Sequence, residues 1–180
     1  EKFREKKKAE ASAEVPSRWP ELVEGAASGK SMPNPASRLP RPLLQQVLSF
    51  FKEKAWPVMK GAAEFCLDWL IENKAGKLIS VPSVSPENTF ITAQGDTAQI
   101  SINASSDIEL MKDLFSNCMQ AAATLQIDDR FIQRLKIAYS KLMPYPIGSK
   151  GQLLEWSTEW EGMDPGHRHL SHMYAVFPGA

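Results

Sequence analysis

A helical repeat of apolar residues begins at Leu43. Spacings of three and four residues, which are typical of an amphipathic helix, separate Leu44, Val47, Leu48 and Phe51. Pro57 interrupts this repeat, and it is either the first residue of a second helix or a kink in one long helix. A broader apolar stripe then runs from residue 58 to residue 70. We expect the helical segment to end at residues 73–76, NKAG, because asparagine and glycine are common helix terminators.

Two further stretches with helical periodicity follow one another, at residues 105–125 and 128–143. The first begins with Ser106 and Glu109, which have the spacing of a capping box. Its expected buried face consists of Ile108, Met111, Leu114 or Phe115, Cys118, Ala122 and Leu125. The expected buried face of the second consists of Phe131, Leu135, Ala138 and Leu142. The short turn between the two stretches predicts an antiparallel αα-hairpin.

The segments outside these helices are irregular in pattern. Residues 78–105 are rich in β-branched side chains and contain two prolines, so we expect a loop with short strands and a hairpin around residues 93–96. A loop of this length in a compact domain is usually functional or disordered, and its apolar content argues against disorder. Residues 152–156 are a candidate short strand, and residues 173–177, MYAVF, are a candidate helix start.

The first 42 residues differ in composition from the rest of the chain. They open with the charge run EKFREKKKAEASAE and contain six of the thirteen prolines, with Gly, Ser and Ala between them. Such a segment buries too little apolar surface to offset its ordering entropy. We therefore expect residues 1–42 to be a disordered or loosely attached tail, and residues 43–180 to form the folded domain.

Charge and cysteine content narrow the class of protein. The 21 basic and 21 acidic side chains balance, so no net field favours nucleic acid or an anionic membrane as a partner. No apolar run reaches the length of a membrane span, and no signal-peptide pattern follows the basic start. Because the chain also begins without Met, we expect a piece of something longer. Cys66 and Cys118 lie in apolar helical patterns, which favours buried thiols over the alternative of a disulfide.

Two groups of carboxylates are candidates for chemistry. Glu87 follows Pro86 in SVSPEN, and a carboxyl group on a constrained loop can act as a general acid; the alternative is an ordinary solvated glutamate. The other group accompanies Trp156 and Trp160, and it consists of Glu155, Glu159, Glu161 and Asp164. Carboxylates beside aromatic faces suit carbohydrate binding, although an acidic turn would look the same in sequence.

The three histidines of the chain all lie in the HRHLSH motif, at His167, His169 and His172. Their spacing differs from the HExxH pattern of zinc enzymes. Arg168 stands between the first two histidines, and its charge argues against a bound cation. The motif alone leaves three roles open: binding of a sugar or an anion, binding of a metal, and a purely structural role.

Five segments in series resemble glycoside hydrolase family 95, the inverting α-L-fucosidases. From about residue 56 to the end they are WPVMKGAAEFCLDWL, PSVSPENTF, SSDIELMKDLFSNCMQAA, GQLLEW and DPGHRHLSHMYAVFPG. The resemblance implies an all-α fold, here an incomplete (α/α)6 barrel with short loop and strand insertions. It implies that Glu87 is the general acid and that Arg168 and His169 contact fucose. We expect Glu155 and Trp156 to bind substrate as well.

The resemblance also implies a hydrolase of terminal α-L-fucosyl linkages, with a fucosylated glycan as partner and with no cofactor and no metal. It implies a secreted or extracellular location for the full-length family member. The family activates water through an asparagine pair upstream of the acid, oriented by an aspartate downstream of HRH. Only Asn34 and Asn73 precede Glu87, and no aspartate follows His172. An inverting enzyme needs both an acid and a base.

We therefore expect a fragment of the catalytic domain that is inactive alone. The alternative is a non-catalytic carbohydrate-binding or helical interaction module on the same scaffold.

Overall fold

The computed structural model describes residues 40–179. The chain divides into two units, residues 1–47 and residues 48–180. The tail expected at residues 1–42 lies, up to residue 39, outside the described residues and stays a prediction. The domain boundary proposed at residue 43 falls within the first described helix, α3, Arg41–Phe50.

The first predicted helical segment consists of three consecutive elements. After α3 comes a π-helical turn, η2, Phe51–Ala55, and then α4, Trp56–Trp69. The amide of Trp56 donates to the carbonyl oxygen of Phe51, five residues earlier. Pro57 lies in the first turn of α4, where its missing N–H is tolerated. The proline therefore starts α4, and the π turn carries the chain into it.

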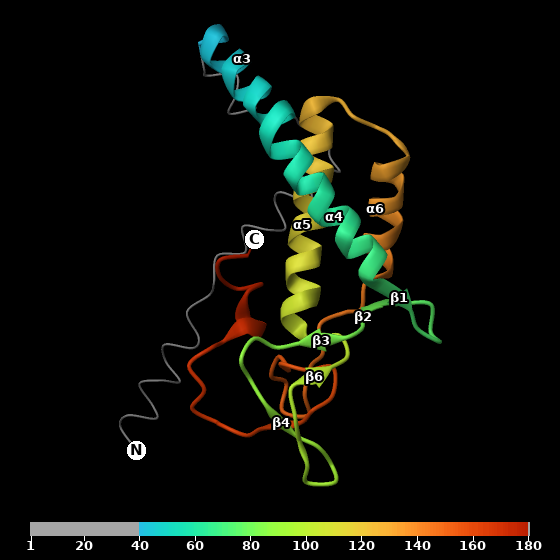
Figure 1. The fold of residues 1–180 in the computed structure, drawn as a ribbon, viewed down its shortest axis with the longest axis vertical. Helices are drawn as coiled ribbons and strands as arrows, with labels where there is room; N and C mark the ends of the chain where they lie inside the picture. The colour runs from blue at the N-terminus through green and yellow to red at the C-terminus, as the bar shows by residue number, and fades with distance from the viewer. Residues whose placement is uncertain (1–39, 180) are drawn as a thin grey trace. The chain divides into compact units, whose positions relative to one another are not determined.

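Helix α5, Ser105–Leu125, packs against both α4 and α6, Arg130–Lys141 (Figure 1). The αα-hairpin is thus confirmed. Of the two alternatives on α5, Phe115 is fully buried and Leu114 only partly so. The core of the three helices includes the predicted residues Met111, Phe115, Cys118, Ala122, Phe131, Leu135, Ala138 and Leu142. The helical period of the sequence was therefore sufficient to identify the packed faces.

The capping box expected at the start of α5 is wrong. The N-cap residue is Ala104, and no side chain caps this end. The Ser106 hydroxyl is buried without a hydrogen-bond partner among the described residues. The amide of Ser105 donates instead to the main-chain oxygen of Glu155, at 3.0 Å. The segment around Glu155 thus caps this end of α5, and the Glu109 side chain is not used as a capping-box partner.

Within residues 40–179, seven short strands form three antiparallel sheets. The first pairs β1, Leu70–Glu72, with β2, Leu78–Ser80, and the second pairs β3, Ser83–Val84, with β6, Ile100–Ser101. In the third, β4, Phe90–Ile91, lies between β5, Thr97–Ala98, and β7, Glu161–Gly162. The hairpin expected around residues 93–96 joins β4 to β5 and is confirmed.

These sheets correct the expected fold class. The described residues form a mixed α/β structure, so the expectation of an all-α fold, as an incomplete (α/α)6 barrel, is wrong. One cause lies at the end of α4. Leu70 takes an extended conformation and pairs with Ser80, so the helix ends at Trp69, four positions before the start of the NKAG turn that was expected to terminate it.

Two local expectations near the C-terminus also differ from the structure. Residues 152–156 do not form the expected strand, and the only β pairing in this segment is an isolated bridge between Leu153 and Ile147. The candidate helix at residues 173–177 is replaced by a 3-10 turn, η3, Ser171–Met173. None of the helices that the structure describes is both long enough and apolar enough to span a bilayer.

The two cysteines are free thiols, as the apolar pattern around them indicated. Burial raises the pKa of the Cys118 thiol to about 11 and also raises the pKa of Cys66. Both side chains therefore stay protonated near neutral pH and act as small apolar groups.

Candidate functional site

Glu87 occupies the third position of a tight turn, Ser85–Asn88. The amide of Asn88 donates to the carbonyl oxygen of Ser85 at 3.1 Å, and Pro86 takes the second position. Glu87 has φ +56°, in the region where a turn of this pattern ordinarily has glycine. A bulky residue in this conformation is strained and is often found at functional sites. The Glu87 side chain is 62% exposed, so the burial of this side chain does not account for the strained backbone conformation.

The Glu87 carboxylate meets two side chains of the HRHLSH motif. His169 Nε2 lies 2.8 Å from Glu87 Oε2, and the Arg168 guanidinium pairs with the same oxygen. The hydrogen bond from His169, followed by the charge of Arg168, lowers the pKa of Glu87. In the unliganded site Glu87 is therefore a carboxylate at neutral pH, and three of the sequence-predicted residues come together in one cluster.

Glu155 connects the loop of Glu87 to the rest of the site. Its side chain is 13% exposed, and its carboxylate accepts a hydrogen bond from Ser85 Oγ at 2.6 Å. The side-chain amide of Asn88 lies 2.9 Å from both carboxylate oxygens. His172 Nδ1 lies 3.7 Å from Glu155 Oε2. The GQLLEW segment thus joins the SPEN loop to the HRHLSH motif.

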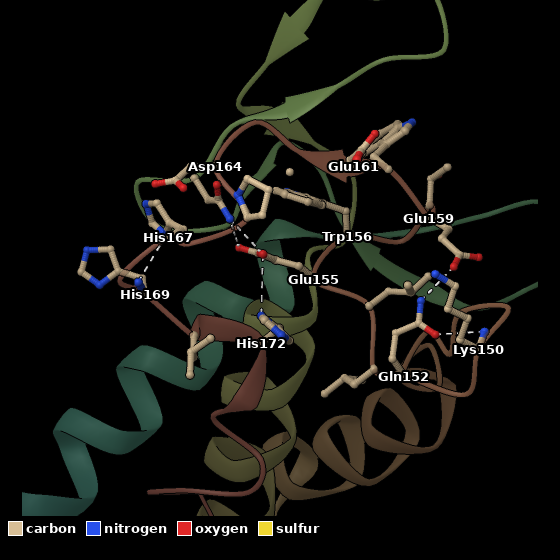
Figure 2. A pocket seen from close by; sticks show the side chains of 18 residues that line it. Lys150, Gln152, Glu155, Trp156, Glu159, Glu161, Asp164, His167, His169 and His172 are labelled. Atoms are coloured by element: carbon tan, nitrogen blue, oxygen red, sulfur yellow. Dashed lines mark hydrogen bonds and ion pairs between the residues drawn. The ribbon is translucent and has the colours of Figure 1, made fainter. Parts of the chain in front are cut away.

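A hollow of about 500 Å³ opens beside this cluster (Figure 2). Glu155, Trp156 and the three histidines contribute to its wall. Its lining also includes Lys150, Glu159, Glu161 and Asp164. Its wall contains both polar and apolar groups, which suits a ligand with hydroxyl groups at its edge and C–H groups on its face.

An aromatic group supports the wall of this hollow. Trp156 is 3% exposed, and its ring centroid lies 5.2 Å from that of Phe90. The Phe90 ring is stacked on Trp160, with centroids 4.0 Å apart and planes 4° apart. Trp156 Nε1 is buried and has no hydrogen-bond partner within the described part of the chain. An unpaired indole N–H is costly to bury.

Glu159, on the far side of the hollow, is held separately. Its carboxylate accepts from the amide and hydroxyl of Ser149 and from the side-chain amide of Gln152. These hydrogen bonds lower the pKa of Glu159, with the Ser149 amide as the main cause. Within residues 40–179 no three His, Cys, Asp or Glu side chains are grouped so as to hold a metal ion.

The structure thus brings all five sequence-predicted site residues to one region, in two layers. Glu87, Arg168 and His169 form the exposed cluster, whereas Glu155 and Trp156 lie beneath it. The sequence analysis missed Ser85 and Asn88, which bracket the turn. An asparagine directly after a Pro-Glu pair is a turn signal, and it was the available clue to Asn88.

Comparison with known proteins adds an independent finding. Residues 45–180 match the family model described as the glycosyl hydrolase family 95 catalytic domain. Alpha-L-fucosidase 2 of Arabidopsis thaliana is 37% identical over 131 residues, or 72% of this chain. Probable alpha-fucosidase A of Aspergillus niger is 31% identical over 137 residues, or 73% of this chain. The chain spans only 16% of the length of each relative.

Proposed function

The chain belongs to the glycosyl hydrolase family 95 catalytic-domain family, and on that premise we propose that it carries the acid half of an α-L-fucosidase site. Within a complete catalytic domain, Glu87 protonates the leaving oxygen of an α-L-fucosyl linkage. The observation that carries this proposal is the cluster of Glu87, Arg168 and His169 beside the hollow, formed by residues 81 and 82 positions apart. The fucosidase names of the two relatives supply the substrate class.

The lowered pKa of Glu87 places a condition on this role, because an acid catalyst must hold a proton near the working pH. Its two main causes are the hydrogen bond from His169 and the charge of Arg168. Both side chains are also donors that can bind sugar hydroxyls. A sugar that takes them as partners withdraws them from the carboxylate and so raises its pKa. Substrate binding therefore itself favours the protonated acid.

The hollow offers the other contacts that a sugar requires. The buried ring of Trp156 lines it, and its Nε1 atom lacks a partner among the described residues. Arg168 is 72% exposed and His169 40% exposed, so both are accessible to a ligand. We assign Arg168 and His169 to fucose hydroxyls and Trp156 to the wall beneath the ring.

The water-activating base is expected from parts of the catalytic domain that residues 45–180 do not contain. The asparagine pair and the aspartate implied by the family resemblance have no counterpart at the expected places in this chain. We therefore propose an inverting reaction for the complete domain and no turnover by the 180-residue chain alone.

A chimera tests the acid role. Residues 45–180 replace the matched segment of the Arabidopsis relative, and the Glu87→Gln variant is compared with the parent chimera. Glutamine keeps the size but cannot donate an acidic proton, so kcat on substrates with poor leaving groups should fall by about 10²–10⁴-fold. Aryl fucosides, whose leaving groups barely need protonation, should lose much less.

The matched control is Glu161→Gln, which removes an exposed carboxylate that also lines the hollow. It should leave the ratio of the two substrate rates unchanged. An equal loss on both substrate types in Glu87→Gln would exclude the acid role. Fucose binding by the 180-residue chain with no activity in any chimera would favour the alternative of a non-catalytic carbohydrate-binding module.

A further inference from the structure

We propose that Glu155 is a positioning residue: its carboxylate clamps both ends of the Ser85–Asn88 turn and thereby holds Glu87 against Arg168 and His169. Two experiments test this role, a titration of Glu87 and an activity measurement, and only the activity measurement rests on the proposed function. In this role Glu155 acts on the turn rather than on substrate, where the sequence analysis expected it to act. Each of its carboxylate oxygens has a partner within the chain itself.

The hydrogen bonds of Glu155 bracket the strained residue. Ser85 and Asn88 are the first and last residues of the turn, and both donate to Glu155 at 2.6–2.9 Å. Glu87, with its positive φ, lies between them. The turn's main-chain hydrogen bond, from Asn88 to Ser85, adds a third link across the same four residues. A strained conformation persists only where its surroundings over-determine it, and these contacts do so here.

The orientation of the Asn88 amide makes a carboxylate necessary at position 155. Asn88 Oδ1 accepts from the Thr89 amide at 2.8 Å, so its Nδ2 group must face Glu155. A carboxylate only accepts hydrogen bonds, whereas a glutamine would present an NH₂ group of its own. In Glu155→Gln the volume is unchanged, but the new NH₂ group would face the Asn88 Nδ2 group, and both are hydrogen-bond donors.

The clamp is fixed to the helical core rather than to another loop. The main-chain oxygen of Glu155 accepts from the amide of Ser105, the first residue of α5. Ser105 Oγ donates to the oxygen of Leu154 at 2.5 Å. The neighbouring Trp156 is buried. Glu87 has no such anchor for its own exposed side chain, so its place is set through the turn that Glu155 holds.

Few lone pairs of Glu155 remain for a ligand. A carboxylate has about four acceptor positions, and Ser85 and Asn88 together make three contacts with it. His172 lies beside the remaining side, at 3.7 Å. A sugar hydroxyl would therefore find only about one acceptor position that the turn does not use. Glu155 therefore acts on the reaction through residues 85–88.

The titration of Glu87 in the full 180-residue chain tests the clamp without any need for activity. Carboxyl ¹³C NMR follows Glu87 in the parent, in Glu155→Gln, in Asn88→Ala and in the double variant. In the parent, His169, Arg168 and the more distant His167 hold the Glu87 pKa below its ordinary 4.5. Releasing the turn should move the Glu87 pKa up toward that value in both single variants. The double variant should move it little further, because both changes break the same contact.

Glu159→Gln is the matched control. Glu159 lines the same hollow and also accepts three hydrogen bonds, but from Ser149 and Gln152 rather than from the turn. Its substitution should leave the titration of Glu87 as in the parent. A Glu87 titration that is unchanged in folded Glu155→Gln, or changed as much in Glu159→Gln, would overturn the clamp. If Glu155→Gln does not fold, Asn88→Ala and Ser85→Ala decide in its place, and no change in either refutes the proposal.

The chimera supplies the catalytic readout. Glu155→Gln should lower kcat by about 10–100-fold with KM changed less than threefold, because a misplaced catalytic group costs rate rather than binding. Loss of binding alone, as a rise in KM at constant kcat, would assign Glu155 to substrate and contradict the inference. If Glu87→Gln has no effect in the chimera but the titration responds to the clamp, the proposed acid role fails and the positioning of Glu87 stands.

Discussion

Between pH 4.5 and about 7, the pH dependence of stability should be dominated by Glu109, a buried carboxyl group on α5. Glu109 is 2% exposed. Glu109 Oε2 accepts from the amide of Ala175 at 3.1 Å, and Oε1 is buried without a partner among the described residues. Burial raises the pKa of Glu109 from 4.5 to about 7, against the opposing effects of the amides of Ala175 and Tyr174 and of the Lys112 charge.

The sign of the effect follows from which state holds the proton. Between pH 4.5 and about 7 the folded chain keeps Glu109 protonated, whereas the unfolded chain releases the proton. The folded state then binds more protons, so stability falls as pH rises. The contribution is fully present below pH 4.5 and is lost as pH rises through 7. At about 1.4 kcal/mol for each pH unit, the ceiling is roughly 3 kcal/mol, and solvent relaxation around the carboxyl reduces the expected loss to about 1–2 kcal/mol.

Urea unfolding of the parent and of Glu109→Gln at pH 5, 6, 7 and 8 measures this loss. Glutamine cannot ionise, so the difference between the two free energies of unfolding should change by about 1–2 kcal/mol across the series, in favour of the variant at high pH. Other titrating groups, such as Asp107 with its raised pKa, occur in both proteins and cancel. Glu64→Gln, an exposed control, should show a constant difference. A constant difference for Glu109→Gln as well would refute the reasoning.

Helix ends and the core provide three further tests by chemical denaturation. Gln126 ends α5 with φ +56°, so Gln126→Gly should stabilise the chain by about 0.5–1 kcal/mol, whereas Thr124→Gly inside the helix should destabilise it by a similar amount. Asp129 caps α6 through the Ile132 amide, so its change to Ala should cost about 1 kcal/mol, and Asp128→Ala less than about 0.5. Phe115→Ala should cost about 3–5 kcal/mol, because its ring is fully buried.

The helical hairpin was predictable from sequence because its information is local. Apolar residues recur every three or four positions along α5 and α6, and the predicted residues Phe115 and Leu135 are fully buried. The sheets carried no comparable signal. Most strands have two residues, which is too short to show an alternating pattern. Some of their partners are distant as well, as with Phe90, which pairs with Gly162, although the β4–β5 hairpin is local. The wrong fold class came from the family resemblance, and the strands were too short for their pattern to correct it.

In the site, too, the sequence indicated which residues take part but not how they are arranged in space. The motifs identified Glu87, Arg168 and His169 by their chemistry, but their meeting at one carboxylate oxygen depends on a turn and on contacts across 81 and 82 residues. Glu155 was expected to face a sugar because it stands next to a tryptophan. The structure places its side chain in the wall of the hollow and against the SPEN loop, where Asn88 meets both of its oxygens, and the expected contact with substrate stays a prediction. Spacing in the sequence does not reveal which donors reach a given carboxylate.

The SPEN, GQLLEW and HRHLSH motifs meet because α5 has two different faces. Its apolar face packs into the core with α4 and α6, whereas polar side chains near its N-terminal end hold the site segments. Ser105 binds residues 154–155, Asp107 accepts from Ser80 and Ser83, Glu109 accepts from Ala175, and Asp113 accepts from Tyr174. Each motif is thus tied to the same helix rather than only to the other motifs. Because the core fixes that helix, the position of the Glu87 cluster depends on packing that is remote from it. A cavity opened beneath α5 should therefore loosen the site as well as lower the free energy of unfolding.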